Sequence, residues 1–210
     1  MSEIFRKPND VFNDASPYGV NTLFLHGLEG SVTGKKATFL KEEWGTLCPP
    51  LRTVGLVAFK EANAGIWPEK KTGDLANALK TPYDDALDAI RYAKPDIVIG
   101  SSMGAAILFK AIAEGHYSGI GVFLAPAITN LLDEATIRQC LSEKSDVLKK
   151  SVWVLGETDT VVSNDDNFFI ARTVGASLLF SPNDCHRLNK AVDSNILNSA
   201  ILTAVEMHDR

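Results

Sequence analysis

The sequence of 210 residues contains few cysteines, and the three that are present, Cys48, Cys140 and Cys185, have no paired spacing. An odd number without a repeated spacing argues against a disulfide framework, and the lack of a C-x-x-C pair argues against a structural zinc site. No apolar run reaches the roughly 18 residues that a membrane span needs, and the first residues lack the apolar core of a signal peptide. These absences predict a soluble protein of the reducing cytoplasm with no bound metal.

The sequence also contains fewer basic than acidic residues. The chain has 26 acidic and 21 basic residues and a formal net charge of -5, so it lacks the basic face of a nucleic-acid-binding protein. Lys35 and Lys36 form the nearest thing to a basic cluster, and we expect them to be solvated surface side chains. Gly34 and Lys35 do not form a phosphate-binding loop, because Glu29 stands where that motif needs glycine and Lys36 where it needs Ser or Thr.

Short apolar runs alternate with segments of helical spacing along the chain. The runs predict six strands, at residues 22–26, 53–59, 96–100, 121–124, 152–155 and 177–180. The helical spacing predicts helices at 35–44, 82–94, 103–114, 165–172 and 190–207, with one or two more over 128–150. Pro82 is expected to open its helix, because proline is tolerated in the first turn. Residues 1–20 are polar and predict an irregular arm.

The strands are continuously apolar, which is typical of strands buried on both faces. The sequence therefore predicts a single α/β domain over residues 1–210, with a mostly parallel sheet of about six strands and helices on both faces. Functional residues of such sheets gather where the strands end, at their carboxyl edge.

Ser102 follows one of these strands directly. Residues 100–104 read Gly-Ser-Ser-Met-Gly, a G-x-S-x-G between an apolar strand and a helix. In this arrangement the serine lies on a tight, strained turn with its hydroxyl above the sheet, and the glycines allow helix and strand to approach closely. Ser102 is therefore the candidate nucleophile.

A candidate base and acid follow the last two strands. His186 lies in a polar loop, and an imidazole can take and return a proton near neutrality. Asp159 lies a few residues beyond residues 152–155, where a carboxylate could orient the histidine. Glu157, Asp165 and Asp166 remain alternatives for the acid.

The loop after the first predicted strand is a candidate for oxyanion binding. Acyl transfer needs backbone N–H donors directed at the developing negative charge. One is expected from Met103, the residue after the candidate nucleophile, and the other from Leu28 in this loop. His26 is expected to hold the loop by hydrogen bonds and not to act as the base.

These segments together resemble the α/β-hydrolase superfamily from about residue 22 onward. LFLHGLEGS is similar to its oxyanion segment, GSSMGA to its nucleophile turn, LGETDTVV to its acid loop and DCHRL to its histidine loop. Cys185 stands where many members have glycine. The chain order Ser102, Asp159, His186 is also that of the superfamily.

The resemblance implies a small serine esterase or thioesterase with a minimal lid, for which residues 128–150 are available. It implies a small acyl ester as substrate, a covalent acyl-enzyme intermediate and no metal or organic cofactor. Leu28, Trp67, Met103 and Ile128 are candidates for an apolar substrate pocket. A non-catalytic binding protein on the same scaffold, or an amide or C–C bond hydrolase with the same residues, are the alternatives.

Overall fold

The computed structural model describes residues 18–69 and 71–210, so most of the predicted N-terminal arm, residues 1–17, lies outside the described residues. The strands are β1 (Thr22–Leu25), β2 (Ile97–Ser101), β3 (Ile120–Leu124), β4 (Val152–Gly156) and β5 (Ser177–Ser181). The helices are α1 (Lys35–Trp44), α2 (Val54–Ala62), α3 (Gly73–Ala93), α4 (Met103–Ala113), α5 (Ile128–Leu131), α6 (Glu134–Glu143), α7 (Ser145–Lys149), α8 (Asn164–Val174), α9 (Asn189–Asp193) and α10 (Ile196–His208).

The described strands form one sheet in the order β1-β2-β3-β4-β5, and every neighbouring pair is parallel. Every residue within the strands β1, β2, β3 and β4 is buried, as the continuously apolar runs predicted. The predicted α/β class and parallel sheet are confirmed, with five strands in place of about six. Because all five strands are parallel, their carboxyl ends share one edge.

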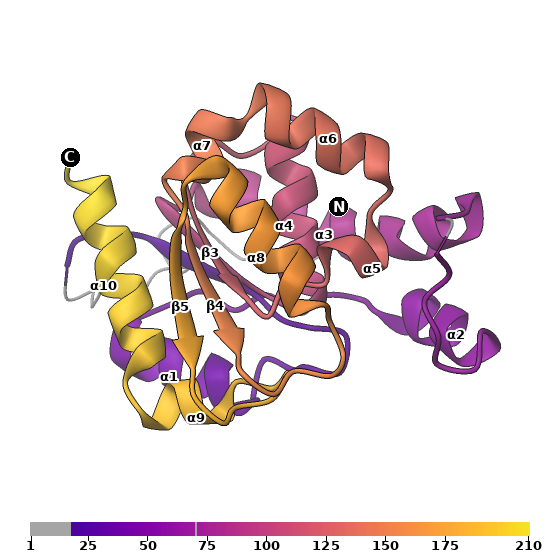
Figure 1. Cartoon of the computed structure of the whole chain (residues 1–210). Coiled ribbons are helices and arrows are strands. Elements are labelled where there is room, and N and C mark those ends of the chain that lie inside the picture. Colours follow the sequence, from indigo (N-terminus) through magenta and orange to yellow (C-terminus); the bar gives the residue numbers. More distant parts are fainter. Residues whose placement is uncertain (1–17, 70) are drawn as a thin grey trace.

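Helices cover both faces of this sheet. Side chains alternate along each strand, so Leu23 and Leu25 enter one core cluster and Phe24 enters the other. The first cluster lies under α3, α4 and α8, and the second under α1, α9 and α10 (Figure 1). Phe123 and Trp153 stack within the first cluster with ring centroids 4.6 Å apart.

The prediction of a strand at residues 53–59 is wrong, because this segment belongs to α2. The edge of the sheet beside β1 is already used by Leu47, which exchanges two backbone hydrogen bonds of 2.8 and 3.0 Å with that strand. The two prolines that follow at positions 49 and 50 have no N–H to extend the pairing. The segment instead forms a helix that buries Leu56 and leaves Val54 80% exposed.

The predicted helix start at Pro82 is also wrong, because α3 begins nine residues earlier, at Gly73. Thr72 caps this helix by accepting a hydrogen bond of 3.4 Å from the backbone N–H of Leu75, a signal that the sequence carried. Pro82 lies buried inside the helix, where its missing N–H leaves the carbonyl of Ala78 without its helical donor.

Among the described residues, no helix is both long enough and apolar enough to cross a membrane.

Two other predicted helical segments are divided. Residues 128–150 form three helices, α5, α6 and α7. The closing segment 190–207 is split into α9 and α10 by Asn195, whose left-handed backbone, with φ of 66°, interrupts the helix.

Candidate active site

Ser102 lies between the end of β2 and the start of α4, as the sequence predicted. Its backbone has φ of 53° and ψ of -110°, which is a strained conformation for a residue with a side chain. The surrounding backbone holds this strain: the N–H of Ser102 donates to the carbonyl of Leu124 at 2.9 Å, and its carbonyl accepts from Ala105 and Ala106, both at 3.1 Å. The hydroxyl is thereby presented at the carboxyl edge of the sheet.

The two glycines of the motif allow α4 to lie directly against the strands. A Cβ atom on Gly104 would lie 2.0 Å from the backbone oxygen of Leu25, and one on Gly100 would lie 2.6 Å from Cα of Ala105. Both obstacles are backbone atoms, which cannot rotate away. The nucleophile turn therefore requires glycine at both positions, because a side chain would collide with the backbone, as the sequence suggested.

His186 lies in the loop between β5 and α9 and joins two other predicted site residues. Its Nε2 is 2.8 Å from Oγ of Ser102, and its Nδ1 is 2.8 Å from Oδ2 of Asp159. An ionised carboxylate can only accept, so Nδ1 carries the ring proton and Nε2 accepts from the serine hydroxyl. The structure thus places Ser102, His186 and Asp159 in one continuous chain of hydrogen bonds.

Asp159 is the carboxylate that contacts the histidine, and its side chain is 0% exposed. Its Oδ1 accepts from the backbone N–H groups of Val161 at 2.8 Å and Val162 at 3.1 Å. Burial opposes ionisation, but the hydrogen bonds from His186 and from these two N–H groups outweigh it and hold the pKa of Asp159 below its ordinary value.

The competing carboxylates make other contacts. Glu157 accepts from the backbone N–H of Asn183 at 2.7 Å, and Asp166 accepts from the hydroxyl of Thr129 at 3.1 Å. Asp165 is exposed in the first turn of α8.

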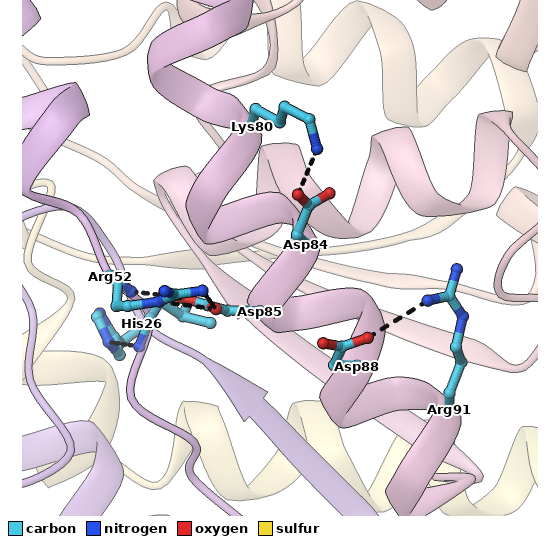
Figure 2. A network of polar contacts seen from close by, with 8 residues as sticks. His26, Arg52, Lys80, Asp84, Asp85, Asp88 and Arg91 are labelled. Atoms are coloured by element: carbon cyan, nitrogen blue, oxygen red, sulfur yellow. Dashed lines mark hydrogen bonds and ion pairs between the residues drawn. The ribbon is translucent and has the colours of Figure 1, made fainter. Parts of the chain in front are cut away.

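His26 holds the loop that follows β1. Its Nε2 accepts from the backbone N–H of Leu51 at 3.1 Å, so its Nδ1 carries the proton and donates to the carbonyl of Gly27 at 2.8 Å. Figure 2 shows His26 beside Arg52, whose guanidinium and backbone N–H both bind Asp85 of α3, with distances from 2.6 to 3.1 Å. The loop is thereby tied through residues 51–52 to a long helix, which is the structural role expected for His26.

The two predicted oxyanion donors belong to segments that lie beside the serine: Met103 follows Ser102 directly, and Leu28 follows Gly27 in the loop after β1. A Cβ on Gly27 would lie 3.2 Å from Cβ of Ser102, so the backbone before Leu28 passes directly beside the nucleophile turn. Within the described part of the chain, the N–H groups of Leu28 and Met103 donate no hydrogen bond to a protein acceptor. Both N–H groups are therefore available to a ligand.

A cavity of about 620 Å³ opens beside Ser102 and His186. Leu28, Trp67 and Met103 line it, in the places predicted for them. The placement of Ile128 needs correction: this side chain is fully buried in the hydrophobic core, and Asn130 and Leu131 of α5 reach the cavity instead.

Part of the cavity wall comes from a segment that the sequence predicted as a strand of the sheet. Leu56 of α2 lines the cavity, and Trp67 stacks on Phe59 of the same helix with centroids 6.4 Å apart. Figure 1 shows α2 projecting from the body of the sheet. In contrast, only the first helix of residues 128–150 reaches the cavity, because α6 packs against α4, where the thiol of Cys140 approaches the carbonyl of Phe109.

Lys36 also lines this cavity, which corrects the prediction that it is a solvated surface residue. Its side chain is half-buried, and its Nζ donates to the carbonyl of Arg187, next to His186, at 2.5 Å. The neighbouring acidic residues of the sequence did not reveal this position, because the contact depends on how α1 packs beside the histidine loop.

A scan of protein-family models finds no match to this sequence, and a search of curated proteins finds none either. Solved structures do match. A proposed hydrolase of the α/β superfamily from Xanthomonas campestris pv. campestris is 20% identical, with a TM-score of 0.57 over 90% of this chain and 97% of that one. Est1E from Butyrivibrio proteoclasticus is 14% identical, with a TM-score of 0.63 over 95% and 93%.

An α/β serine hydrolase homologue from Coxiella burnetii is 15% identical, with a TM-score of 0.54 over 88% of this chain and 83% of that one. Identities this low establish a shared fold. The chain has the α/β-hydrolase fold, as the sequence motifs predicted.

Proposed function

We propose that this protein is a serine hydrolase that cleaves a small carboxylic ester or thioester through an acyl-enzyme intermediate. The observation that carries the proposal is the hydrogen-bonded chain from Ser102 through His186 to Asp159, placed on a strained turn at the wall of a cavity. Strain of this kind is costly and is found where it serves a site.

The first half of the reaction forms the acyl-enzyme. Nε2 of His186 takes the hydroxyl proton of Ser102 as Oγ attacks the ester carbonyl. The N–H groups of Leu28 and Met103 stabilise the negative charge that develops on the carbonyl oxygen. The C–O bond to the alcohol then breaks, and the alcohol leaves with the proton from His186.

The second half releases the acid. His186 takes a proton from water, whose oxygen attacks the acyl carbon, and returns that proton to Oγ of Ser102 as the acid departs. Asp159 keeps the proton of the free imidazole on Nδ1 and stabilises the imidazolium that forms in both halves. The depressed pKa of Asp159 keeps it ionised for this role.

The structural neighbours support this proposal. They include a serine hydrolase homologue and Est1E, and Est1E has also been solved with ferulic acid bound. A cavity of about 620 Å³ is within the range that holds small organic ligands. We propose an acyl or alcohol group of that size.

Hydrolysis of a chain-length series of p-nitrophenyl esters tests the proposal, with wild type beside Ser102→Ala. We expect turnover that Ser102→Ala reduces by about 10³-fold or more. Ser199→Ala, which removes an exposed hydroxyl on α10 that donates to the carbonyl of Asn195, is the matched control and should keep full activity. Turnover that survives in Ser102→Ala would contradict the mechanism.

The same assay separates the alternatives. Cleavage of p-nitroanilides in preference to esters would indicate an amidase. Saturable binding of esters without turnover would indicate a binding protein on this fold.

A further inference from the structure

The cavity wall carries an excess of positive charge. Lys35, Lys36, Lys60 and Arg187 line it, whereas Glu29 is the one carboxylate among the described residues of the wall. This contrasts with the formal net charge of -5 of the whole chain. The excess is therefore local to the cavity.

Three of these four cations have carboxylate partners. Lys35 pairs with Asp193 at 2.6 Å, and Glu29 pairs with Lys60 at 3.2 Å and with Arg187 at 3.7 Å. These pairs compensate most of the charge at the cavity mouth.

Lys36 is the exception. Its ammonium forms no ion pair with any carboxylate of the described residues, and its protein contact is the neutral carbonyl of Arg187. Asp184 lies close enough to influence Lys36, but its oxygens are used by Ser181, Cys185 and Ala191, at 2.8 to 3.0 Å.

A half-buried ammonium that no carboxylate of the described residues contacts directly is costly. Burial lowers the pKa of Lys36 to about 8, although Asp184 and Cys185 act in the opposite direction. An ammonium has three N–H donors, and the carbonyl of Arg187 takes one of them. The others can bind a ligand in the cavity, and an anionic ligand would give the ammonium the directly contacting negative group that the described residues do not supply.

We propose that the cavity selects esters that carry an anionic group, such as a carboxylate, separate from the scissile ester, and that Lys36 recognises this group. Lys36 lies on the histidine side of the cavity, because the residue that it binds directly follows His186. Lys35 and Lys36 also form the first turn of α1, where the helix dipole adds to the positive potential.

The rest of the wall fits the other part of such a substrate. Leu28, Trp67 and Val161, which are all at least partly exposed, provide apolar surface. A ligand with an apolar body and one charged end matches this division, whereas a wholly apolar ester would leave Lys36 desolvated and unpaired.

The inference rests on the proposed hydrolase function, and paired substrates test it. One pair places the charge on the acyl side: mono-p-nitrophenyl suberate and its neutral methyl ester. The other places it on the alcohol side: 4-acetoxybenzoate and its neutral methyl ester. We expect kcat/KM to favour the charged member of one pair by about tenfold, as a charge-assisted hydrogen bond in a partly buried site would produce.

Substitution of Lys36 should remove this preference. Lys36→Met is expected to bring the charged-to-neutral ratio of kcat/KM close to one, and Lys36→Arg should retain most of it. Lys80→Met makes the same charge change at an exposed residue of α3 outside the cavity wall, so its ratio should match that of wild type. If Lys36→Met lowers both members of a pair equally, Lys36 only supports the histidine loop and the proposal is wrong.

Two results separate this inference from the proposed function. Ester turnover that depends on Ser102 but shows no charge preference in either pair would overturn the inference and leave the hydrolase intact. If no ester is turned over, calorimetry on Ser102→Ala decides the inference alone: monomethyl suberate should bind about tenfold more tightly than dimethyl suberate. Equal affinities would overturn it.

Discussion

Single residues in this molecule have functions that depend on their immediate hydrogen bonds. Ser102 has its hydroxyl bonded to His186, and His186 has its ring orientation fixed by Asp159. Asp159 in turn accepts hydrogen bonds from two backbone N–H groups, so this series of hydrogen bonds ends on the main chain. The proposed roles of these residues can be tested one at a time.

Asp159→Asn should reduce kcat by about 10³–10⁴-fold, because an amide can donate to Nδ1 and so favour the wrong tautomer of His186. Asp165→Asn removes the same charge from an exposed residue nearby and should leave kcat unchanged within about twofold. Steady-state kinetics on p-nitrophenyl acetate measures both. Equal effects of the two substitutions would show that Asp159 has no special role.

His26→Phe should reduce kcat by about 10²-fold, because the loop that carries Leu28 would lose both hydrogen bonds that position it. His26→Gln should recover part of this loss, since its side-chain oxygen can still accept from the N–H of Leu51. His116→Phe, at an exposed histidine outside the cavity, is the control. Thermal unfolding of each variant shows whether it has folded, and full activity in a folded His26→Phe would contradict the role given to this ring.

At the scale of elements, the site depends on how closely α4 approaches β1 and β2. The glycines at positions 100 and 104 permit that approach, and any side chain at either position would collide with backbone atoms. The strained turn at Ser102 is one consequence of this close packing.

Gly104→Ala should lower the free energy of unfolding by about 3 kcal/mol or more, because its Cβ would lie 2.0 Å from a backbone oxygen. Gly73→Ala is the matched comparison: its Cβ would meet no atom within 4 Å, and alanine suits the first turn of α3. We expect Gly73→Ala to change stability by no more than about 1 kcal/mol, in the stabilising direction. Urea unfolding measures both, and a Gly104→Ala protein as stable as wild type would show that the packing is looser than described.

The sequence predicted those elements whose local pattern and tertiary role agree. The buried strands were recognisable as apolar runs, and Ser102, Asp159 and His186 were found because each follows such a run. The sequence offered four carboxylates as partners for His186, with Asp159 preferred. Only the geometry of the loop after β4 shows that Asp159 contacts His186 and that Glu157 does not.

The errors have a common physical origin in tertiary context. Residues 53–59 have strand-like composition, yet Leu47 already occupies the edge of the sheet. Pro82 resembles a helix start, yet the helix forms through it because packing of its buried face compensates the lost hydrogen bond. Ile128 was expected in the cavity and lies in the core, and Lys36 was expected on the surface and lines the cavity, because the local sequence shows neither position.

Across the whole molecule, charge is distributed unevenly. The chain is acidic overall, while the cavity beside Ser102 is lined by four cations and one carboxylate among the described residues. The single-domain organisation and the cytoplasmic location stay predictions.

The preference for charged esters should fall as the pH rises through about 8, because Lys36 loses its proton over that range. Asp184, Cys185 and Arg187 are the charged or titratable neighbours of Lys36, and the first two favour its charged form. The charged-to-neutral ratio of kcat/KM, followed from pH 7 to 9.5 in the substrate pair that shows the preference, measures this loss, since the carboxylates of suberate and of benzoate both stay ionised throughout. Lys36→Arg should show no such decline, because arginine remains charged; a parallel decline in that variant would assign the titration to another group.

In the proposed mechanism Ser102 is the nucleophile and becomes covalently acylated. Intact-mass spectrometry after treatment with a fluorophosphonate probe, followed by peptide mapping, tests it most directly. We expect one adduct per chain, located on Ser102, absent from Ser102→Ala and formed much more slowly in Asp159→Asn. An unlabelled wild-type protein, or a label on a different residue, would contradict it.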